Sequence, residues 1–262
     1  MKTSFLFLLS FSSLLFVSCN ESKAPDTPTN DKAGDESQTL SFEERVRRNI
    51  ESQLKIAPGE KYQLDIHLEH LDSDTIQDAV IVVNRLEMAI QKSVGSQSAD
   101  TKRKYGYMGN YNYFAIYDGK RDQISRCQII ASSAKAPLQV HFENIQSDLF
   151  KNLVITYRIR NSGFRNYYLY ENGQLAIMFQ WKSFDALGEE NYEANFFQYD
   201  QGSYSLAKDI LIYRGKIGNY QLPIQDIYLF KPMIESTGQL RYRFFYDPKS
   251  QKYMTTDQVT GL

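Results

Sequence analysis

The order of apolar and polar residues changes several times along the chain, and each change predicts a different kind of segment. Residues 5–17 carry no charge. Residues 20–40 are mostly Pro, Asp, Thr, Asn, Lys, Gly and Ser, the composition of a disordered tether. From residue 42 apolar residues recur every fourth position, and after Gly59 they alternate with polar ones. These two periods predict one helix followed by β-strands.

A single amphipathic helix is predicted over residues 41–56. Ser41, with Glu44 three residues later, is typical of a capping box at a helix N-terminus. The apolar stripe consists of Phe42, Val46, Ile50 and Leu54. The run Ala57-Pro58-Gly59 ends the helix, because proline lacks the backbone N–H that a further turn would need.

Short strands rich in Tyr, Phe and Ile are predicted for the rest of the chain. The first strand places Leu64, Ile66 and Leu68 on one face and polar residues on the other. Four later strands end in an acidic residue before a turn: residues 113–118, 167–171, 196–200 and 244–247. Such strand-turn units are typical of hairpins and meanders.

An internal repeat relates two parts of the chain at an offset of 74 residues. Ten positions between Leu64 and Ile81 match positions between Leu138 and Ile155, and seven of the ten are identical. Further along, residues 114–118 match 167–171 at an offset of 53. The difference, 74 minus 53, assigns 21 additional residues to the first copy, within 84–110. Each copy is therefore predicted to be a strand, an acidic loop and further antiparallel strands.

The acidic loop of the first copy, residues 70–78, resembles the loop of FG-GAP or VCBS repeats, the blade units of integrin-type β-propellers. The resemblance covers these loops and the strands that follow them. It implies a Ca²⁺ site whose ligands are Asp72, Asp74 and Asp78, because a hard cation prefers several oxygens from one tight loop.

Two residues of this loop depart from the family pattern. His70 stands where an oxygen ligand is usual, and Thr75 replaces the turn glycine. The second copy retains one carboxylate, Asp148. The alternative is that side-chain hydrogen bonds hold both loops in place of an ion.

The N-terminus has the three parts of a secretory signal, namely Lys2, the apolar residues 5–17, and a small residue before Cys19. The apolar stretch is shorter than the roughly 20 residues of a membrane-spanning helix. The ending Phe16-Val17-Ser18-Cys19 resembles the lipobox of bacterial lipoproteins, although Phe16 stands where Leu is usual. The resemblance implies export, acylation of Cys19, with palmitate among its acyl chains, and anchoring in the cell envelope, with the outer membrane as the expected site. An ordinary signal peptide with a chance Cys is the alternative.

These patterns predict a mainly β chain, with antiparallel meanders in two propeller-blade-like repeats, further hairpins and one N-terminal amphipathic helix. The expected organisation is a signal peptide (1–18), an acylated Cys with its tether (19–40) and one β-rich domain (41–262). The domain is divided into repeat one (about 62–135), repeat two (about 136–215) and C-terminal hairpins (216–262).

Acylation of Cys19 would leave the second cysteine, Cys127, without an intramolecular partner, so no disulfide is expected. Alternation places Cys127 on the same face as Ile129 and Ala131. We therefore expect a buried and unreactive thiol.

Charge and motifs narrow the function classes. The chain has 30 basic and 31 acidic residues, a balance that argues against a nucleic-acid partner. It contains no Gly-x-Ser-x-Gly, Walker, dinucleotide-binding, His-Glu-x-x-His or Cys-x-x-Cys motif, which weakens an enzyme interpretation without removing it.

A zinc site is considered at His67, Glu69, His70 and Asp72, but polar neighbours on one strand and loop need not converge, so surface hydrogen bonding is favoured.

The additional residues of the first copy contain the strongest candidate binding loop. Its cations and rings are Lys102, Arg103, Lys104, Tyr105 and Tyr107, a combination suited to anionic polymers or sugar faces. A solvated, disordered loop is the alternative.

The sequence as a whole predicts a non-enzymatic lipoprotein of the cell envelope. It would be anchored to the membrane by its N-terminal lipid and would bind a protein or glycan partner through exposed loops. The alternative is an envelope polysaccharide or peptidoglycan hydrolase that uses carboxylates in a groove.

Overall fold

A computed structural model describes residues 40–221, 226–227 and 230–259 of the chain. The predicted signal segment, Cys19 and nearly all of the predicted tether lie outside these residues. The helices are α1 (Phe42–Leu54), α2 (Leu86–Ser93) and α3 (Ala99–Lys104). The strands are β1 (Gln63–Glu69), β2 (Asp78–Asn84), β3 (Met108–Asp118), β4 (Gln123–Ile124), β5 (Gln128–Ser133), β6 (Gln139–Glu143), β7 (Asn152–Ile159), β8 (Ser162–Glu171), β9 (Gln174–Asp185), β10 (Glu193–Asp200), β11 (Asp209–Ile217), β12 (Ile234–Asp247) and β13 (Lys252–Met254).

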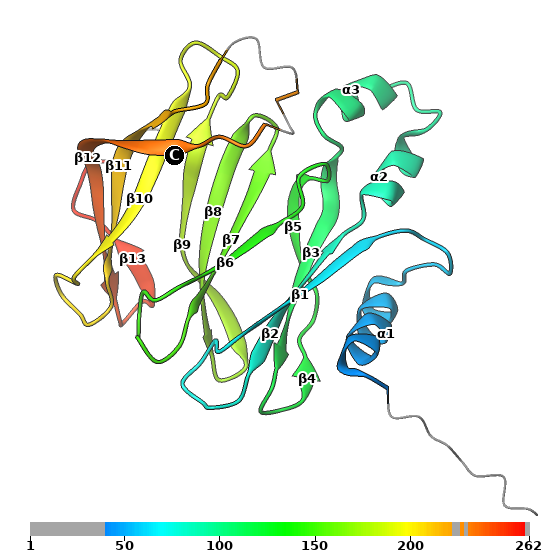
Figure 1. Ribbon diagram of the computed structural model, residues 1–262, viewed down its shortest axis with the longest axis horizontal. Coiled ribbons are helices and arrows are strands. Elements are labelled where there is room, and N and C mark those ends of the chain that lie inside the picture. Colours follow the sequence, from blue (N-terminus) through cyan, green and yellow to red (C-terminus); the bar gives the residue numbers. More distant parts are fainter. Residues whose placement is uncertain (1–39, 222–225, 228–229, 260–262) are drawn as a thin grey trace, which may run out of the picture. The chain divides into compact units, whose positions relative to one another are not determined.

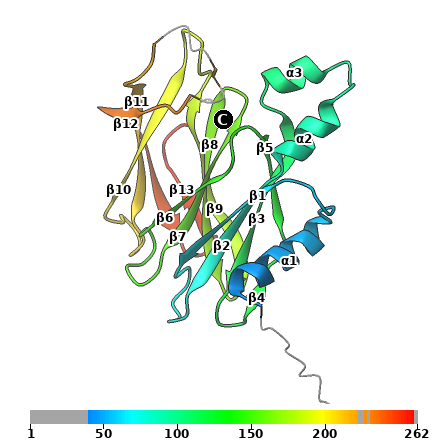
Figure 2. The ribbon, with the colours of Figure 1, turned by 45° about the vertical axis from the view of Figure 1, so that its right-hand side comes forward.

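The strands form two antiparallel sheets, which confirms the predicted fold class. One sheet has the order β1-β2-β3-β4, with β5 also paired to β3, and the other has the order β13-β12-β11-β10-β9-β8-β7-β6 (Figures 1 and 2). The four predicted strand ends are also confirmed, since β3, β8, β10 and β12 end at Asp118, Glu171, Asp200 and Asp247.

The described strands make three meanders of the same kind, one more than the two predicted. The meanders are β1-β2-β3-β5, β6-β7-β8-β9 and β10-β11-β12-β13. In each, the residues that pair next to the loop between the first two strands are nine positions apart in the sequence. These pairs are Glu69 with Asp78, Glu143 with Asn152 and Asp200 with Asp209. The boundary expected between residues 215 and 216 falls inside β11, because that strand belongs to the third meander.

Helix α1 begins with the predicted capping box. The Ser41 hydroxyl accepts a hydrogen bond from the Glu44 backbone N–H at 3.3 Å, and the Glu44 carboxylate accepts one from the Ser41 N–H at 2.9 Å. The apolar stripe of α1 covers one face of the five-stranded sheet, where Val46 and Ile50 are fully buried.

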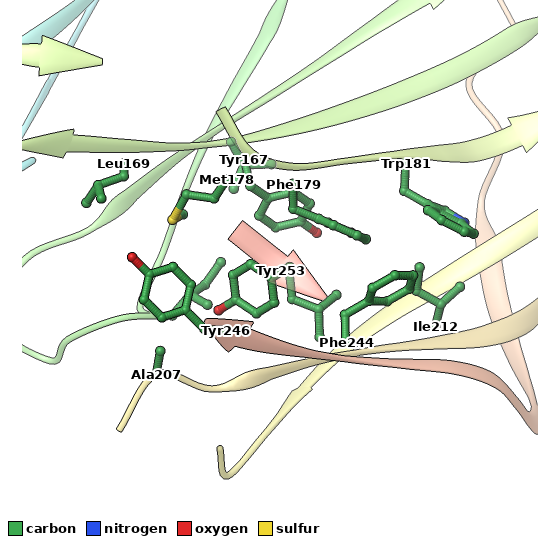
Figure 3. Close-up of a cluster of buried hydrophobic side chains, with 13 residues drawn as sticks. Tyr167, Leu169, Met178, Phe179, Trp181, Ala207, Ile212, Phe244, Tyr246 and Tyr253 are labelled. Atoms are coloured by element: carbon green, nitrogen blue, oxygen red, sulfur yellow. The ribbon is translucent and has the colours of Figure 1, made fainter. Parts of the chain in front are cut away.

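Two further cores stack the meanders face to face. One joins the five-stranded sheet to the second meander and includes Val80, Phe114, Ile155 and Tyr168. The other, rich in aromatic rings, joins the second meander to the third (Figure 3). Strands β9 and β10 share only two residue pairs, so side-chain packing is the main connection between these two meanders.

The offset of 53 predicted for the third strands is wrong by two residues. Val80 pairs with Ile116 in the first meander, whereas its equivalent Val154 pairs with Tyr167 in the second, which gives an offset of 51. A slip of two residues keeps every side chain on the same face of a strand, so alternation alone cannot detect it. The first meander therefore has 23 additional residues, the difference between 74 and 51.

Candidate functional site

The additional residues of the first meander form two short helices and not the single loop expected from the sequence. Helices α2 and α3 lie between β2 and β3, at one end of the strands (Figure 1). A small core of Ala89, Tyr107 and Ala134 fixes them to the sheet. We call this end of the strands, with α2, α3 and the β7–β8 turn, the insert end.

Two cations flank one aromatic ring at the insert end, and a third, Lys102, lies nearby on α3 and donates to the Ser96 hydroxyl at 3.4 Å. Lys102 and Lys104 are exposed in the last turn of α3, where a positive charge also suits the helix dipole. The Lys104 ammonium lies 5.8 Å from the centre of the Tyr105 ring, and the guanidinium of Arg160 lies 4.9 Å from it. Arg160 comes from the β7–β8 turn, so the ring brings cations of two meanders together.

The other two residues of the predicted binding loop have different surroundings. Arg103 pairs with Asp100 at 2.7 Å, and both side chains are exposed. Tyr107 is buried, and its backbone N–H donates to the Lys102 carbonyl at 2.7 Å. Tyr107 therefore belongs to the core beneath α2 and not to the surface. We call the surface formed by Lys102, Lys104, Tyr105 and Arg160 the cationic site.

Arg160 could not be found from the sequence, because it lies 55 positions after Tyr105 in a turn with no motif of its own. The only local signal is its backbone: Arg160 has a φ of 53°, a left-handed conformation typical of a tight turn.

The predicted calcium ligands lie at the opposite end of the strands. The Asp72 carboxylate accepts the Asp74 N–H, and the Asp74 carboxylate accepts the Ile76 N–H, both at 2.9 Å. Asp78 is only 1% exposed and accepts the N–H groups of Leu71 and Gly119. All three carboxylates thus hold their own loop or the adjacent turn, as in the alternative that side-chain hydrogen bonds maintain the loops.

No group of three or more His, Cys, Asp or Glu side chains is close enough to hold a metal ion in the part of the chain that the structure describes. The residues considered for zinc, namely His67, Glu69, His70 and Asp72, are not gathered into such a group. Calcium binding by Asp72, Asp74 and Asp78, whose carboxylates accept backbone N–H groups, stays a prediction.

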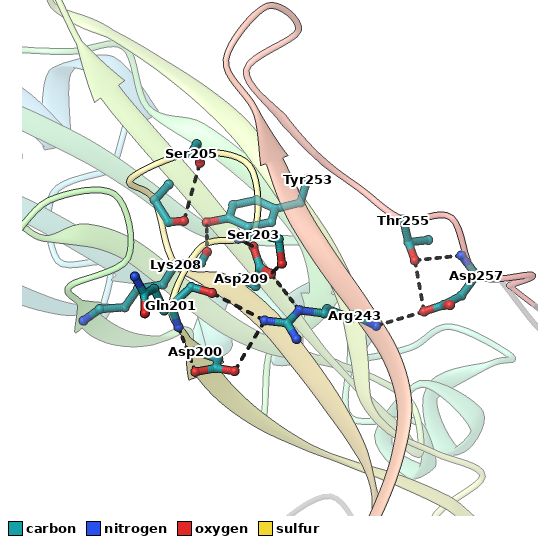
Figure 4. Close-up of polar contacts among 11 residues, drawn as sticks. Asp200, Gln201, Ser203, Ser205, Lys208, Asp209, Arg243, Tyr253, Thr255 and Asp257 are labelled. Atoms are coloured by element: carbon teal, nitrogen blue, oxygen red, sulfur yellow. Dashed lines mark hydrogen bonds and ion pairs between the residues drawn. The ribbon is translucent and has the colours of Figure 1, made fainter.

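A third loop of the same design, residues 201–208, was missed in the sequence. Its buried Asp209 accepts the Ser203 N–H at 3.1 Å (Figure 4). In the same way Asp78 accepts the Leu71 N–H, and Asn152 accepts the Gln146 N–H. Arg243 donates to the same Asp209 carboxylate at 2.7 Å. The equal spacing from Asp200 to Asp209 was the available signal, but the residues between them share little with the other two loops.

Two buried carboxylates at the ends of β2 and β3 have opposite pKa shifts. Burial raises the pKa of Asp78. Burial also acts to raise the pKa of Asp118, but hydrogen bonds from Tyr170 and Arg121 outweigh it and hold that pKa below its ordinary value. Opposed shifts are typical of acid–base pairs. Here, however, the carboxylates bond to the fold and are at most 5% exposed, which leaves a substrate no access.

One pocket of about 460 Å³ contains two acidic side chains near an aromatic ring. It is lined by Glu190, Glu193 and Tyr192 together with the cations Arg214, Lys216 and Arg241. Both glutamates are exposed, and Glu193 pairs with Arg241 at 3.5 Å. Arg214, Lys216 and Arg241 line the pocket together with the two glutamates, so it is not the aromatic-lined groove of carboxylates that the hydrolase alternative requires, and that alternative stays a prediction.

Cys127 lies half-buried between α1 and the five-stranded sheet, and its backbone N–H donates to Gln53 at 2.8 Å. Cys127 packs in the same core as Tyr113, and Ile129 pairs with Tyr113 across the sheet, so the cysteine and Ile129 lie on one face as predicted. Ile129 itself is 53% exposed.

Cys127 is expected to react slowly with iodoacetamide in the folded protein. Burial raises the pKa of its thiol to about 11, so little thiolate is present at neutral pH. We expect alkylation roughly 300-fold slower than in the urea-unfolded chain, where the pKa is about 8.5, because the thiolate fraction falls tenfold for each unit of pKa. Mass spectrometry of timed reactions would measure both rates, and equal rates would show that the thiol is not shielded.

Comparison with protein-family models, with curated proteins and with solved structures finds no match for this chain. Among the described residues, no helix has both the length and the apolar composition needed to cross a membrane. The function of the chain must therefore be inferred from its own residues. Among its surfaces, the cationic site is the clearest candidate for binding a partner.

Proposed function

We propose that this chain is a non-enzymatic lipoprotein of the bacterial cell envelope that binds a protein or glycan partner through the cationic site. The lipobox-like residues ending at Cys19 support the anchoring part of this proposal. The binding part is carried by one observation, the gathering of Lys104 and Arg160 around the Tyr105 ring.

The position of the cationic site supports a binding role. Strand β3 runs from the insert end, at Met108, to Asp118 beside the first turn of α1. Eleven strand residues span about 33 Å, so the cationic site lies that far from the point where the described chain begins. A lipid attached before that point would leave the insert end free to reach a partner.

The charge of the site favours a partner that carries carboxylates or phosphates. Lys102 and Lys104 have no acidic partner among the ion pairs of the described residues, and Arg160 contacts a ring face. A sugar polymer with acidic groups could use both the charges and the aromatic ring. We therefore take an anionic glycan as the form of partner to test first.

Replacing Lys102, Lys104 and Arg160 with Gln is expected to weaken binding to an anionic polysaccharide about tenfold. Each exposed charge contact contributes about 0.5 kcal/mol, and three together correspond to roughly one decade in Kd. Calorimetric titration of the full chain with polygalacturonate, and with neutral dextran for comparison, would measure the effect. Added salt should weaken the binding as well.

The matched control removes three exposed cations that lie outside the insert end, as Lys120→Gln, Arg126→Gln and Lys249→Gln, and should bind like the original chain. Equal losses in both triple variants would show a nonspecific charge effect. If the polysaccharides do not bind but crosslinking in intact envelopes captures a protein through the insert end, the glycan form of the proposal fails and the protein form stands. If neither polysaccharide binds and crosslinking captures no partner, the binding role is contradicted.

A further inference from the structure

Apolar side chains project into solvent from the end of the strands opposite the insert end. Leu206 is 100% exposed, Leu149 is 82% exposed and Tyr204 is 74% exposed. Leu149 and Leu206 occupy the same position in the second and third loops, each three residues before the buried Asn152 or Asp209. Because exposed leucine is unfavourable in water, its recurrence at equivalent loop tips indicates a surface that becomes covered.

Backbone hydrogen bonds hold the three loops side by side. The Lys151 N–H of the second loop donates to the His70 carbonyl of the first at 2.8 Å. The Lys208 N–H of the third loop donates to the Ile145 carbonyl of the second loop, also at 2.8 Å. The apolar tips therefore belong to one continuous edge, which we call the loop end.

The described chain begins at this same end. Arg45, in the first turn of α1, pairs with Asp122 in the β3–β4 turn at 2.9 Å, and the Phe42 ring contacts Tyr117. That turn lies against the first loop, because Gly119 donates to Asp78 at 3.1 Å, and a Cβ at Gly119 would lie 2.1 Å from the Gln77 carbonyl oxygen. The segment that contains Cys19 thus joins the domain at the loop end.

The charges of the loop end do not select an electrostatic partner. Its loops and turns contain both acidic and basic residues, namely Asp72, Asp74 and Asp148 and also Lys120, Lys151 and Lys249. Leucine and tyrosine at loop tips are side chains that enter the interfacial layer of a bilayer, where the apolar part is buried and the tyrosine hydroxyl stays hydrated.

We infer that Leu149, Tyr204 and Leu206 insert into the surface of the bilayer that holds the lipid on Cys19. The loop end then faces the membrane and the cationic site points away from it. This inference rests on the proposed function, because it requires the N-terminal lipid to bring the loop end to the membrane. Loop insertion fixes the orientation of the domain at the bilayer, which attachment through one lipidated residue does not do by itself.

The test places a fluorescent label on single cysteines in the lipid-anchored full chain, reconstituted in vesicles of phosphatidylethanolamine and phosphatidylglycerol. The labelled variants are Leu149→Cys, Leu206→Cys and Val94→Cys, each combined with Cys127→Ser. Val94 is the matched control, since it is also an exposed apolar residue, at 75%, but lies in the α2–α3 connection of the insert end. Circular dichroism would establish that each variant is folded.

Labels at positions 149 and 206 should shift to shorter emission wavelengths and be quenched by lipids with brominated acyl chains, whereas the label at 94 should show neither effect. Higher ionic strength should leave this quenching unchanged, because insertion is apolar. Three unquenched labels on protein that sediments with the vesicles would overturn the inference and leave lipid anchoring intact. A wavelength shift without quenching by brominated lipid would assign the loop end to a protein contact and also overturn it. Protein that does not sediment with the vesicles would contradict the anchor itself, and with it this inference.

Discussion

Glu60→Gln is expected to lower the free energy of unfolding by about 3–5 kcal/mol. Glu60 accepts hydrogen bonds from Nε and Nη2 of Arg85, each at 2.6 Å, and the two side chains are only 11% and 6% exposed. Arg85 also donates to the carbonyl of Leu54 in the last turn of α1. Without the carboxylate, the guanidinium would remain charged in a site shielded from water, and such an uncompensated charge is costly.

The ion pair between Arg103 and Asp100 supplies the matched control. Its N–O distance of 2.7 Å is similar, but the two side chains are 66% and 92% exposed. Asp100→Asn should therefore change stability by less than about 1 kcal/mol. Urea unfolding followed by the emission of the single tryptophan, Trp181, would measure both variants. Similar small losses in the two variants would show that burial does not strengthen the Glu60 pair.

The same pair predicts a pH dependence with a definite sign. The hydrogen bond from Arg85 holds the pKa of Glu60 below its ordinary value in the folded protein. The ionised carboxylate therefore stabilises the fold above the unfolded pKa of about 4.3, and this contribution is lost as the pH falls through the lower, folded pKa. In Glu60→Gln the loss of stability over this acidic range should be smaller, which unfolding curves at several pH values would show.

Local patterns predicted the elements whose side chains decide their own structure. The capping box at Ser41 and Glu44 and the apolar stripe of α1 need only neighbouring residues, and both are present. The aromatic strands that end in an acidic residue were equally clear, because alternation and turn composition are local. The offset of 74 is retained in the pairing of β1 with β2 and β6 with β7, where Ile66 pairs with Ile81 and Val140 with Ile155.

The errors arose where tertiary contacts decide the structure. Helix α2 has an apolar face of Leu86, Ala89 and Ile90, but it is short and becomes stable by packing on Tyr107 and Ala134. The third meander escaped detection because its loop preserves a spacing and one buried Asp, while Gly202 and Tyr204 replace the residues of the other loops. A match of residue types could not reveal a loop whose shared features are one buried acceptor, Asp209, and its spacing from Asp200.

The cationic site shows the same division between local and long-range information. Lys102, Lys104 and Tyr105 are adjacent in the sequence, so their combination was visible. Arg160 joins them only because the first two meanders stack and bring the β7–β8 turn next to α3. The position of Arg160 relative to α3 therefore depends on the packing of the first two meanders. A variant that separates these meanders should also move Arg160 away from Lys102 and Lys104.

Phe179→Ala is expected to lower the free energy of unfolding by about 3–5 kcal/mol, the usual cost of truncating a buried aromatic ring. Phe179 on β9 is 7% exposed and contacts four other rings, those of Tyr167, Trp181, Phe244 and Tyr253, with centroid distances of 4.7 to 5.9 Å (Figure 3). Tyr204→Ala is the matched control, because Tyr204 is 74% exposed and contacts one ring, that of Phe245. Its loss should be below about 1 kcal/mol.

The position of Phe179 also predicts where the protein loosens. Phe244 and Tyr253 belong to the third meander, which is paired to the second through only two residue pairs between β9 and β10. Because packing of this core is the main connection, Phe179→Ala should speed amide hydrogen exchange in β10 to β13 more than in β1 to β3, and should shift Trp181 emission to longer wavelength. Uniform acceleration across all three meanders would contradict this and show that they unfold as one cooperative unit. Selective acceleration in the third would show that this aromatic core, more than the short β9–β10 ladder, holds the eight-stranded sheet together.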